Sequence, residues 1–328
     1  MKHLHKWLIA LLIIVGLVAG CGDATEENDV EPNEDATSEV TEETDETDED
    51  VTDFPVTVTD SSGEEVTLDE EPESIVSIMP SNTEMAFALG LGEAIVGVSE
   101  HDNYPEEVFD IEQVGGMELN VELMLSLEPD LVLAHESNGE ETIDQLREAG
   151  LNVFVVKDAT NFAEVYESIE MTSEITGTVE QGEEIIQSME DGFAQLAEKA
   201  EDIADDEMAT VYIEISPEPE IYTPGNHTFE QEILSLINAE NVVKEDGWVM
   251  INEEEVVDMN PDVIIVTYDY TDDPVGEVLA RDAWQDITAV KDERVIQVDT
   301  DVVSRPGPRL VEGAETLAKA IYPEIFDE

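Results

Sequence analysis

Two stretches of this chain share one design, and that repeat restricts the fold more than any other feature. Residues 121–134 and 253–266 each begin with apolar residues spaced three to four apart, reach a Pro-Asp pair and end in an apolar run. Because proline disfavours the helical conformation for the residue before it, the helices should end near Glu128 and Asn260. The short apolar runs LVLA and VIIV are typical of interior parallel strands. The chain therefore contains the same helix–strand unit twice.

The segments around the two copies alternate between predicted strands and predicted helices, which indicates parallel sheets flanked by helices. We expect an N-terminal lobe at 54–176 and a C-terminal lobe at 207–328. Between them, 177–206 contains no proline and favours one long helix, from about Val179 to Ala204. The predicted fold is α/β, with two lobes that each hold a small parallel sheet and are joined by one long helix.

The charge of the chain excludes one class of partner. There are 84 Asp and Glu residues against 12 Lys and Arg residues, so the formal net charge is −72. Phosphate-rich surfaces repel such a polyanion, and we expect no binding to nucleic acid. The excess of carboxylates predicts a surface adapted to high salt, where screening weakens self-repulsion. An ordinary acidic extracellular protein is the alternative.

The first 53 residues predict export and anchoring. Residues 1–21 have a basic start, an apolar core and the ending Val-Ala-Gly-Cys, which resembles a bacterial lipobox. Cys21 is the only cysteine, so we expect it to carry a lipid, and disulfides within the chain are excluded. Residues 22–53 are acidic with few apolar residues and predict a disordered tether. The expected location is the extracellular face of the cytoplasmic membrane in a salt-adapted, Gram-positive bacterium.

Several polar residues follow predicted strands, where α/β proteins place ligand contacts. His101 lies in one such loop, and Tyr222, Asn226 and His227 are expected in another. Ser81 and Glu84 fit a capping box, which predicts a structural role for Glu84. Arg305 and Arg309 are expected in a loop rich in Pro and Gly that follows the last predicted strand, although only ten Lys and Arg residues follow Cys21. Arg305 is expected to bind a phosphate or carboxylate of a ligand, and Arg309 to be structural.

Several motifs in order resemble one known family. They are residues 77–97, Tyr104-Pro105, residues 114–116, the two Pro-Asp copies and residues 304–309 (SRPGPR). Together they are similar to the helical-backbone substrate-binding lipoproteins of ABC importers for cobalamin and ferric siderophores. The resemblance implies a non-catalytic, monomeric receptor without a resident cofactor. It also implies that the receptor holds a chelate between two lobes and delivers it to a permease driven by a cytoplasmic ATPase.

The resemblance also implies roles for individual residues. Glu122 and Glu254, one in each copy of the repeat, match the glutamates that dock on permease arginines. The ligand-facing positions hold His101, Met117, His135, Tyr222, Trp248 and Arg305. Trp248 is expected in a loop. Cobalamin or a related corrinoid is the first expected ligand, a ferric siderophore is the alternative, and haem is less favoured.

Two other functions compete with this interpretation. The three histidines after the signal peptide, His101, His135 and His227, could bind Zn²⁺ or Mn²⁺ together with a carboxylate, although their spacing matches no metal motif. An enzyme is disfavoured because the sequence has no nucleophile elbow, no HExxH and no Gly-rich phosphate loop.

Overall fold

The computed structural model describes residues 54–204 and 206–327, which all belong to one compact unit. The predicted signal peptide with Cys21 and the predicted tether at 22–53 lie outside the described residues. Within the described part, every helix is too short or too polar to cross a membrane.

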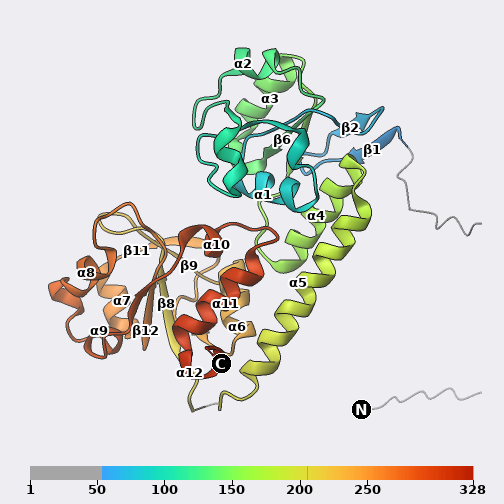
Figure 1. Ribbon diagram of the computed structural model, residues 1–328. Coiled ribbons are helices and arrows are strands. Elements are labelled where there is room, and N and C mark those ends of the chain that lie inside the picture. The colour runs from blue at the N-terminus through green and yellow to red at the C-terminus, as the bar shows by residue number, and fades with distance from the viewer. Residues whose placement is uncertain (1–53, 205, 328) are drawn as a thin grey trace, which may run out of the picture. The chain divides into compact units, whose positions relative to one another are not determined.

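The first lobe is built on five parallel strands in the order β5-β4-β3-β6-β7 (Figure 1). The strands are β3 (Ile75–Ser77), β4 (Ile95–Val98), β5 (Glu112–Gln113), β6 (Leu131–His135) and β7 (Val153–Val156). Its helices are α1 (Pro80–Ala88), α2 (Val121–Ser126) and α3 (Glu140–Glu148), with short 3-10 helices η1 (Gly92–Ala94), η2 (Glu106–Asp110) and η3 (Glu136–Asn138). An antiparallel hairpin of β1 (Val56–Thr59) and β2 (Glu65–Leu68) precedes the sheet. All residues of β3, β6 and β7 are buried, as expected for strands covered on both faces.

The second lobe is built on four parallel strands in the order β10-β8-β12-β13. They are β8 (Thr210–Glu214), β10 (Glu240–Asn241), β12 (Val263–Val266) and β13 (Val295–Gln297). A separate antiparallel pair consists of β9 (Ile221–Pro224) and β11 (Trp248–Ile251). The helices are α6 (Phe229–Leu236), α7 (Glu253–Met259), α8 (Pro274–Leu279), α9 (Thr288–Lys291), α10 (Thr300–Ser304), α11 (Leu310–Ile321), α12 (Pro323–Phe326) and the 3-10 helix η4 (Asp282–Trp284). The predicted α/β class, with two lobes of parallel sheet flanked by helices, is confirmed.

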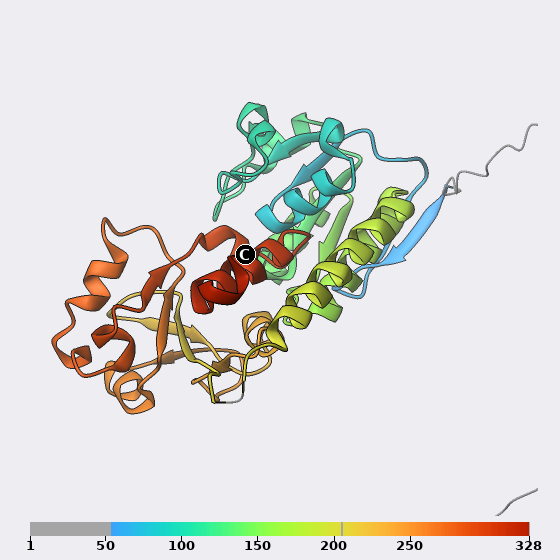
Figure 2. The ribbon, with the colours of Figure 1, turned by 60° about the horizontal axis from the view of Figure 1, so that its bottom comes forward.

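Two packed helices join the lobes. They are α4 (Phe162–Thr176) and α5 (Val179–Ala200), which ends four residues before the predicted Ala204. The rings of Phe162 and Phe193 stack with centroids 4.1 Å apart. Figures 1 and 2 show α5 passing along α11, which it contacts. One continuous core contains buried side chains of β6, α5 and β12, so the two lobes share apolar packing. We propose the same lobe boundaries as the sequence suggested.

The repeated unit is confirmed, and both copies use the same local devices. Asn120 and Asn252 cap helices α2 and α7, because their side chains accept hydrogen bonds from backbone N–H groups three residues on, at 3.0 and 3.1 Å. The residues before the prolines, Glu128 and Asn260, adopt left-handed conformations with φ of 50° and 46°. A left-handed residue ends each helix and turns the chain into β6 or β12.

Three local expectations are wrong. Tyr222 and Trp248 do not lie in loops: Tyr222 belongs to β9 and Trp248 begins β11. Arg305 does not directly follow the last strand, because α10 intervenes. In each case a short element with exposed or polar residues lacks the periodicity that sequence analysis depends on.

Candidate functional site

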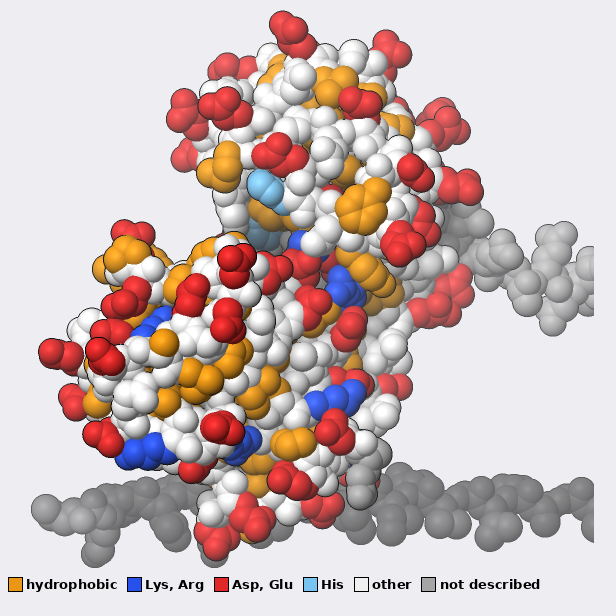
Figure 3. All heavy atoms as spheres, turned by 60° about the vertical axis from the view of Figure 1, so that its left-hand side comes forward, with side chains coloured by type: hydrophobic (Ala, Val, Ile, Leu, Met, Phe, Trp, Pro, Cys, Tyr) orange, Lys and Arg blue, Asp and Glu red, His pale blue; other side chains and the backbone are white. Residues whose placement is uncertain are grey.

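Two adjoining hollows form a cleft at the carboxyl ends of the first sheet. One hollow, of about 140 Å³, is lined by residues that include His101, Met117 and Ser99. The other, of about 190 Å³, is lined by residues that include His135 and Arg305. Both hollows share Met79, Pro80 and Ser137 in their walls, so they form one continuous surface. Figure 3 shows histidine side chains and a basic side chain gathered where the upper and lower parts of the molecule meet.

His101 and Met117 come from two loops that follow β4 and β5. Met117 is 94% exposed. His101 is also exposed, and its Nε2 lies 3.9 Å from Oε1 of Glu100. The structure therefore brings together these two residues that were predicted to face the ligand. An imidazole and a thioether beside one another offer an apolar contact surface with a polar edge.

His135 is the last residue of β6 and is buried. Its Nδ1 accepts a hydrogen bond from the backbone N–H of Ser137 at 3.2 Å, so the neutral ring carries its proton on Nε2. The hydroxyl of Ser137 lies 2.9 Å from the same Nδ1 and donates to Oδ2 of Asp158 at 3.2 Å. Burial lowers the pKa of His135, against the influence of nearby carboxylates including Asp158. His135 is therefore a neutral side chain at neutral pH.

Arg305 connects the two lobes. Its Nη1 donates to Oε1 of Glu84 at 2.6 Å and to Oδ1 of Asn103 at 2.9 Å, and its Nη2 lies 2.8 Å from Oδ1 of Asp301. Asn103 also donates to Asp301, at 2.6 Å. Glu84 and Asn103 belong to the first lobe, whereas Asp301 and Arg305 belong to the second. The carboxylates that pair with this guanidinium thus come from the protein itself.

The predicted capping role of Glu84 is wrong. Helix α1 begins at Pro80, after the N-cap residue Met79, and no side chain caps it. Glu84 is 5% exposed and points to Arg305 and Arg309, whose Nη1 lies 3.3 Å from its Oε1. Burial raises the pKa of Glu84, while both arginines oppose that shift. Pro80, three residues after the buried strand β3, sets the helix start in place of Ser81.

Arg309 has the contacts of a structural residue. Besides Glu84, it reaches Glu312 with Nε at 3.3 Å. Its guanidinium also lies over the ring of Tyr104, 3.9 Å from the centroid, at a distance typical of a cation–π interaction. We name Glu84, Asn103, Asp301, Arg305 and Arg309 the inter-lobe cluster. Sequence analysis gave no role to Asn103 or Asp301 and gave Glu84 a capping role, although the only charged residue of α1 is a signal for a buried partner.

Tyr222 and Trp248 lie apart from the other four predicted ligand residues, because neither lines the two hollows. Both are partly exposed and sit on the β9–β11 pair, where Trp248 faces Pro224 in register. The indole Nε1 of Trp248 donates to Oε1 of Glu230 at 3.1 Å, and its ring packs against Phe229 with centroids 5.9 Å apart. Glu230, which sequence analysis did not single out, therefore fixes the orientation of Trp248.

The histidines predicted as alternative metal ligands are not assembled into a site. His227 is exposed, and its Nε2 lies 3.5 Å from Oδ1 of Asp246. Within residues 54–204 and 206–327, no group of three or more His, Cys, Asp and Glu side chains could hold a metal ion.

The two glutamates predicted to dock on a permease occupy equivalent positions. Glu122 and Glu254 are exposed in the first turns of α2 and α7. A carboxylate is favoured at this end of a helix by the helix dipole. The positions therefore suit surface display, one in each lobe.

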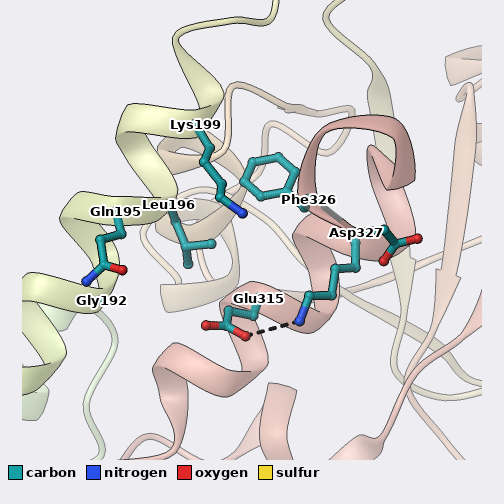
Figure 4. Close-up of a pocket in the computed structure, with 8 residues that line it drawn as sticks. Gly192, Gln195, Leu196, Lys199, Glu315, Phe326 and Asp327 are labelled. Atoms are coloured by element: carbon teal, nitrogen blue, oxygen red, sulfur yellow. Dashed lines mark hydrogen bonds and ion pairs between the residues drawn. The ribbon is translucent and has the colours of Figure 1, made fainter.

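A larger pocket, of about 420 Å³, lies away from the cleft, between α5, α11 and α12 (Figure 4). Lys319 pairs there with Glu315 at 3.2 Å, and Lys199 lies 6.0 Å from the ring centroid of Phe326. With Asp327 also in the wall, two ammonium groups face two carboxylates. None of the predicted ligand residues lines this pocket, so we place the candidate site in the cleft.

Comparison with known proteins identifies the family. An ABC transporter substrate-binding lipoprotein of Bacillus subtilis (strain 168) is 44% identical over 323 residues, which cover 97% of each chain. The cobalamin-binding protein of Halobacterium salinarum is 30% identical over 279 residues, 82% of this chain and 74% of its own. A solved structure of a possible iron-binding (periplasmic solute-binding) protein from Staphylococcus epidermidis superposes with a TM-score of 0.70 at 34% identity, over 77% of this chain and all of its own.

The family model described as periplasmic binding protein matches residues 75–302, which are more than half of the chain. This stretch contains both copies of the repeated unit and the residues that line the cleft up to α10. The family resemblance stated from the sequence is confirmed, and the chain belongs to the periplasmic binding protein family.

Proposed function

We propose that this chain is the lipid-anchored, extracytoplasmic substrate-binding component of an ABC importer, and that its cleft captures cobalamin or a related corrinoid. The observation that carries the proposal is the meeting of His101, Met117, His135 and Arg305 on one surface between the lobes. A chelate of this kind is larger than either hollow and would bridge both. The role is non-catalytic: the cleft residues hold a ligand and release it to a permease.

The choice of ligand class is supported by the relatives. A cobalamin-binding protein is among those that align over most of the chain, and this favours a corrinoid. The similarity to a possible iron-binding protein supports a ferric siderophore as the second candidate. Haem is third. We do not propose Zn²⁺ or Mn²⁺, because the three histidines are not brought together.

The cleft residues have distinct parts in this proposal. Arg305 uses three of its five N–H groups within the inter-lobe cluster, so two are left to donate to the ligand. His101 and Met117 supply contact surface at the mouth of the cleft. Tyr222 and Trp248 would reach the ligand from the second lobe, with Trp248 held in place by Glu230.

The test is quenching of intrinsic tryptophan fluorescence by ligands added to the full chain at high salt. Cyanocobalamin, a neutral ferric hydroxamate, ferric citrate and haemin are titrated in parallel. Trp284 is buried, and Trp248 is partly exposed, so a Trp248→Phe variant separates contact quenching from absorption of light by the coloured ligands. We expect saturable quenching by cyanocobalamin that disappears in Trp248→Phe. Saturable quenching by a ferric chelate alone would mean that the cleft binds a ferric chelate and serves iron uptake.

We further propose that Glu122 and Glu254 dock on the permease. Changing both to alanine should leave ligand affinity unchanged and abolish ligand uptake by vesicles that contain the permease and its ATPase. The matched control is Glu141→Ala with Glu277→Ala, because these glutamates are also exposed in first helical turns, one in each lobe. Normal uptake by the Glu122 and Glu254 double variant would refute the docking role.

Anchoring is proposed from the lipobox-like sequence that ends at Cys21. A Cys21→Ser variant should be released into the medium, whereas the unchanged chain should stay with the membrane fraction. Release of both forms to the same extent would contradict a lipid anchor.

A further inference from the structure

The inter-lobe cluster determines how much positive charge the cleft can offer a ligand. Within the cluster, Arg305 and Arg309 carry two positive charges, and Glu84 and Asp301 carry two negative charges within 3.3 Å of them. Glu312, outside the cluster, adds an exposed carboxylate 3.3 Å from Arg309. The arginine and carboxylate charges of the cluster therefore cancel. Both guanidinium groups and Glu84 are largely buried, with side chains 15%, 17% and 3% exposed, so this pairing is weakly screened by salt.

Apart from Arg305, no lysine or arginine adds positive charge to the described walls of the cleft. Asp158 contributes a further carboxylate to the wall. Burial lowers the pKa of His135, which therefore stays neutral at neutral pH. An anionic ligand would meet an arginine that is already neutralised, inside a chain whose net charge is −72.

We infer that the cleft selects a metal chelate without net negative charge, and that Glu84 sets this selectivity by neutralising Arg305. This inference rests on the proposed function and narrows its ligand class. Side-chain amides of a corrinoid, or the carbonyl groups of a neutral hydroxamate chelate, can accept the two remaining N–H groups of Arg305. A ligand carboxylate in the same place would lie beside Glu84 and Asp301 and be repelled by them.

The inference is tested with pairs of ligands whose members differ by one carboxylate. One pair is cyanocobalamin and its monocarboxylic acid, in which one side-chain amide is hydrolysed. A neutral ferric hydroxamate and the same chelate carrying one added carboxylate form a second pair. Binding of each ligand to the full chain is measured by titration calorimetry at low and at high salt.

For the unchanged protein we expect the neutral member of the bound pair to be favoured about tenfold or more, with a smaller ratio at high salt. Glu84→Gln keeps the size of the side chain and one acceptor oxygen but removes the buried negative charge that neutralises Arg305. In that variant the preference should fall to about equal binding or reverse. The matched control is Glu312→Gln, which removes the same charge beside Arg309 but at a side chain that is 62% exposed. It should leave the preference unchanged.

The outcomes distinguish a failure of the proposed charge selectivity from a failure of the proposed receptor function. Equal binding of both members of a pair by the unchanged protein, at low salt, would overturn the charge selectivity while leaving the receptor function intact. A Glu84→Gln variant that weakens both members by one common factor would reduce Glu84 to a structural residue. If that variant fails to fold, the affinities of the unchanged protein for the two members of a pair still test the charge selectivity. Failure to bind any chelate would overturn the proposed function itself.

Discussion

Glu230 leads to a quantitative prediction because it is a buried carboxyl group beside Trp248. The residue is 5% exposed. Its Oε1 accepts the indole N–H, and its Oε2 is buried without a hydrogen-bond partner among the described residues. Burial raises the pKa of Glu230 from 4.5 to about 7, although nearby donors, among them the indole N–H of Trp248, oppose the shift. The side chain is therefore protonated in the folded protein under mildly acidic conditions.

The shift determines how stability depends on pH. Because the pKa is higher in the folded state, that state keeps a proton that the unfolded chain releases. The resulting stabilisation is fully present below about pH 4.5 and is lost as pH rises through about 7. At about 1.4 kcal/mol per pH unit, the complete effect is roughly 3 kcal/mol, of which about 2–3 kcal/mol falls between about pH 5 and pH 8.

The assay is equilibrium unfolding by urea at these two pH values, for the unchanged chain and for Glu230→Gln. Glutamine imitates the protonated carboxyl group but does not titrate. The other carboxylates are common to both proteins and cancel in the difference. We expect the unchanged chain to lose about 2–3 kcal/mol more than the variant between the lower and the higher pH. Glu183→Gln, which removes an exposed carboxylate on α5, should behave like the unchanged chain.

A second readout comes from Trp248 itself. Ionisation of Glu230 changes the acceptor of the indole N–H, so the emission of Trp248 should change with a midpoint near pH 7. The change should be missing in Glu230→Gln. Parallel pH profiles of stability for Glu230→Gln and the unchanged chain would refute the reasoning, because they would mean that Glu230 titrates alike in the folded and unfolded states.

Three further changes test the packing of the lobes. Arg281→Met should lower the free energy of unfolding in urea by roughly 3–5 kcal/mol. Glu214 would stay fully buried without the guanidinium that now contacts both its oxygens at 2.7 Å. A loss below about 1 kcal/mol would contradict this. Gly313→Ala should lower the free energy of unfolding by about 1–3 kcal/mol, because the added methyl group would lie 2.1 Å from the carbonyl oxygen of Val302. An unchanged melting temperature would show that α10 moves freely to make room for it. Asp60→Ala should lower the free energy of unfolding by about 1–3 kcal/mol. This buried carboxylate accepts hydrogen bonds from backbone N–H groups of the hairpin turn and of β7. Undiminished protection of those N–H groups from hydrogen exchange would argue against this role.

Features that depend on neighbours in the sequence were predictable. The helices of the two copies end near Glu128 and Asn260 because proline acts on the residue directly before it. The apolar run VIIV was predicted as a strand and forms β12 over the same residues, since such a run is a local pattern. The long helix α5 was predicted from the lack of proline, and only its last turn differed.

Features that depend on distant partners were not predictable. Glu84 and Arg305 are 221 positions apart, and no local pattern states that one will neutralise the other. The sequence around Glu84 fits a capping box equally well, so the local signal favoured the wrong role. Trp248 was placed in a loop because β11 alternates only weakly and pairs with β9 alone. Its partner Glu230 became apparent only when the helix α6 and the strand β11 were seen side by side.

The shared core has a consequence for the kinetics of ligand capture. Apolar side chains of β6, α5 and β12 belong to one cluster, and a wide swing of the lobes would expose part of it to water. The molecule can flex elastically, but its ligand must enter through a mouth that already exists. The observed association rate should then rise linearly with ligand concentration, without the plateau that a slow closing step imposes.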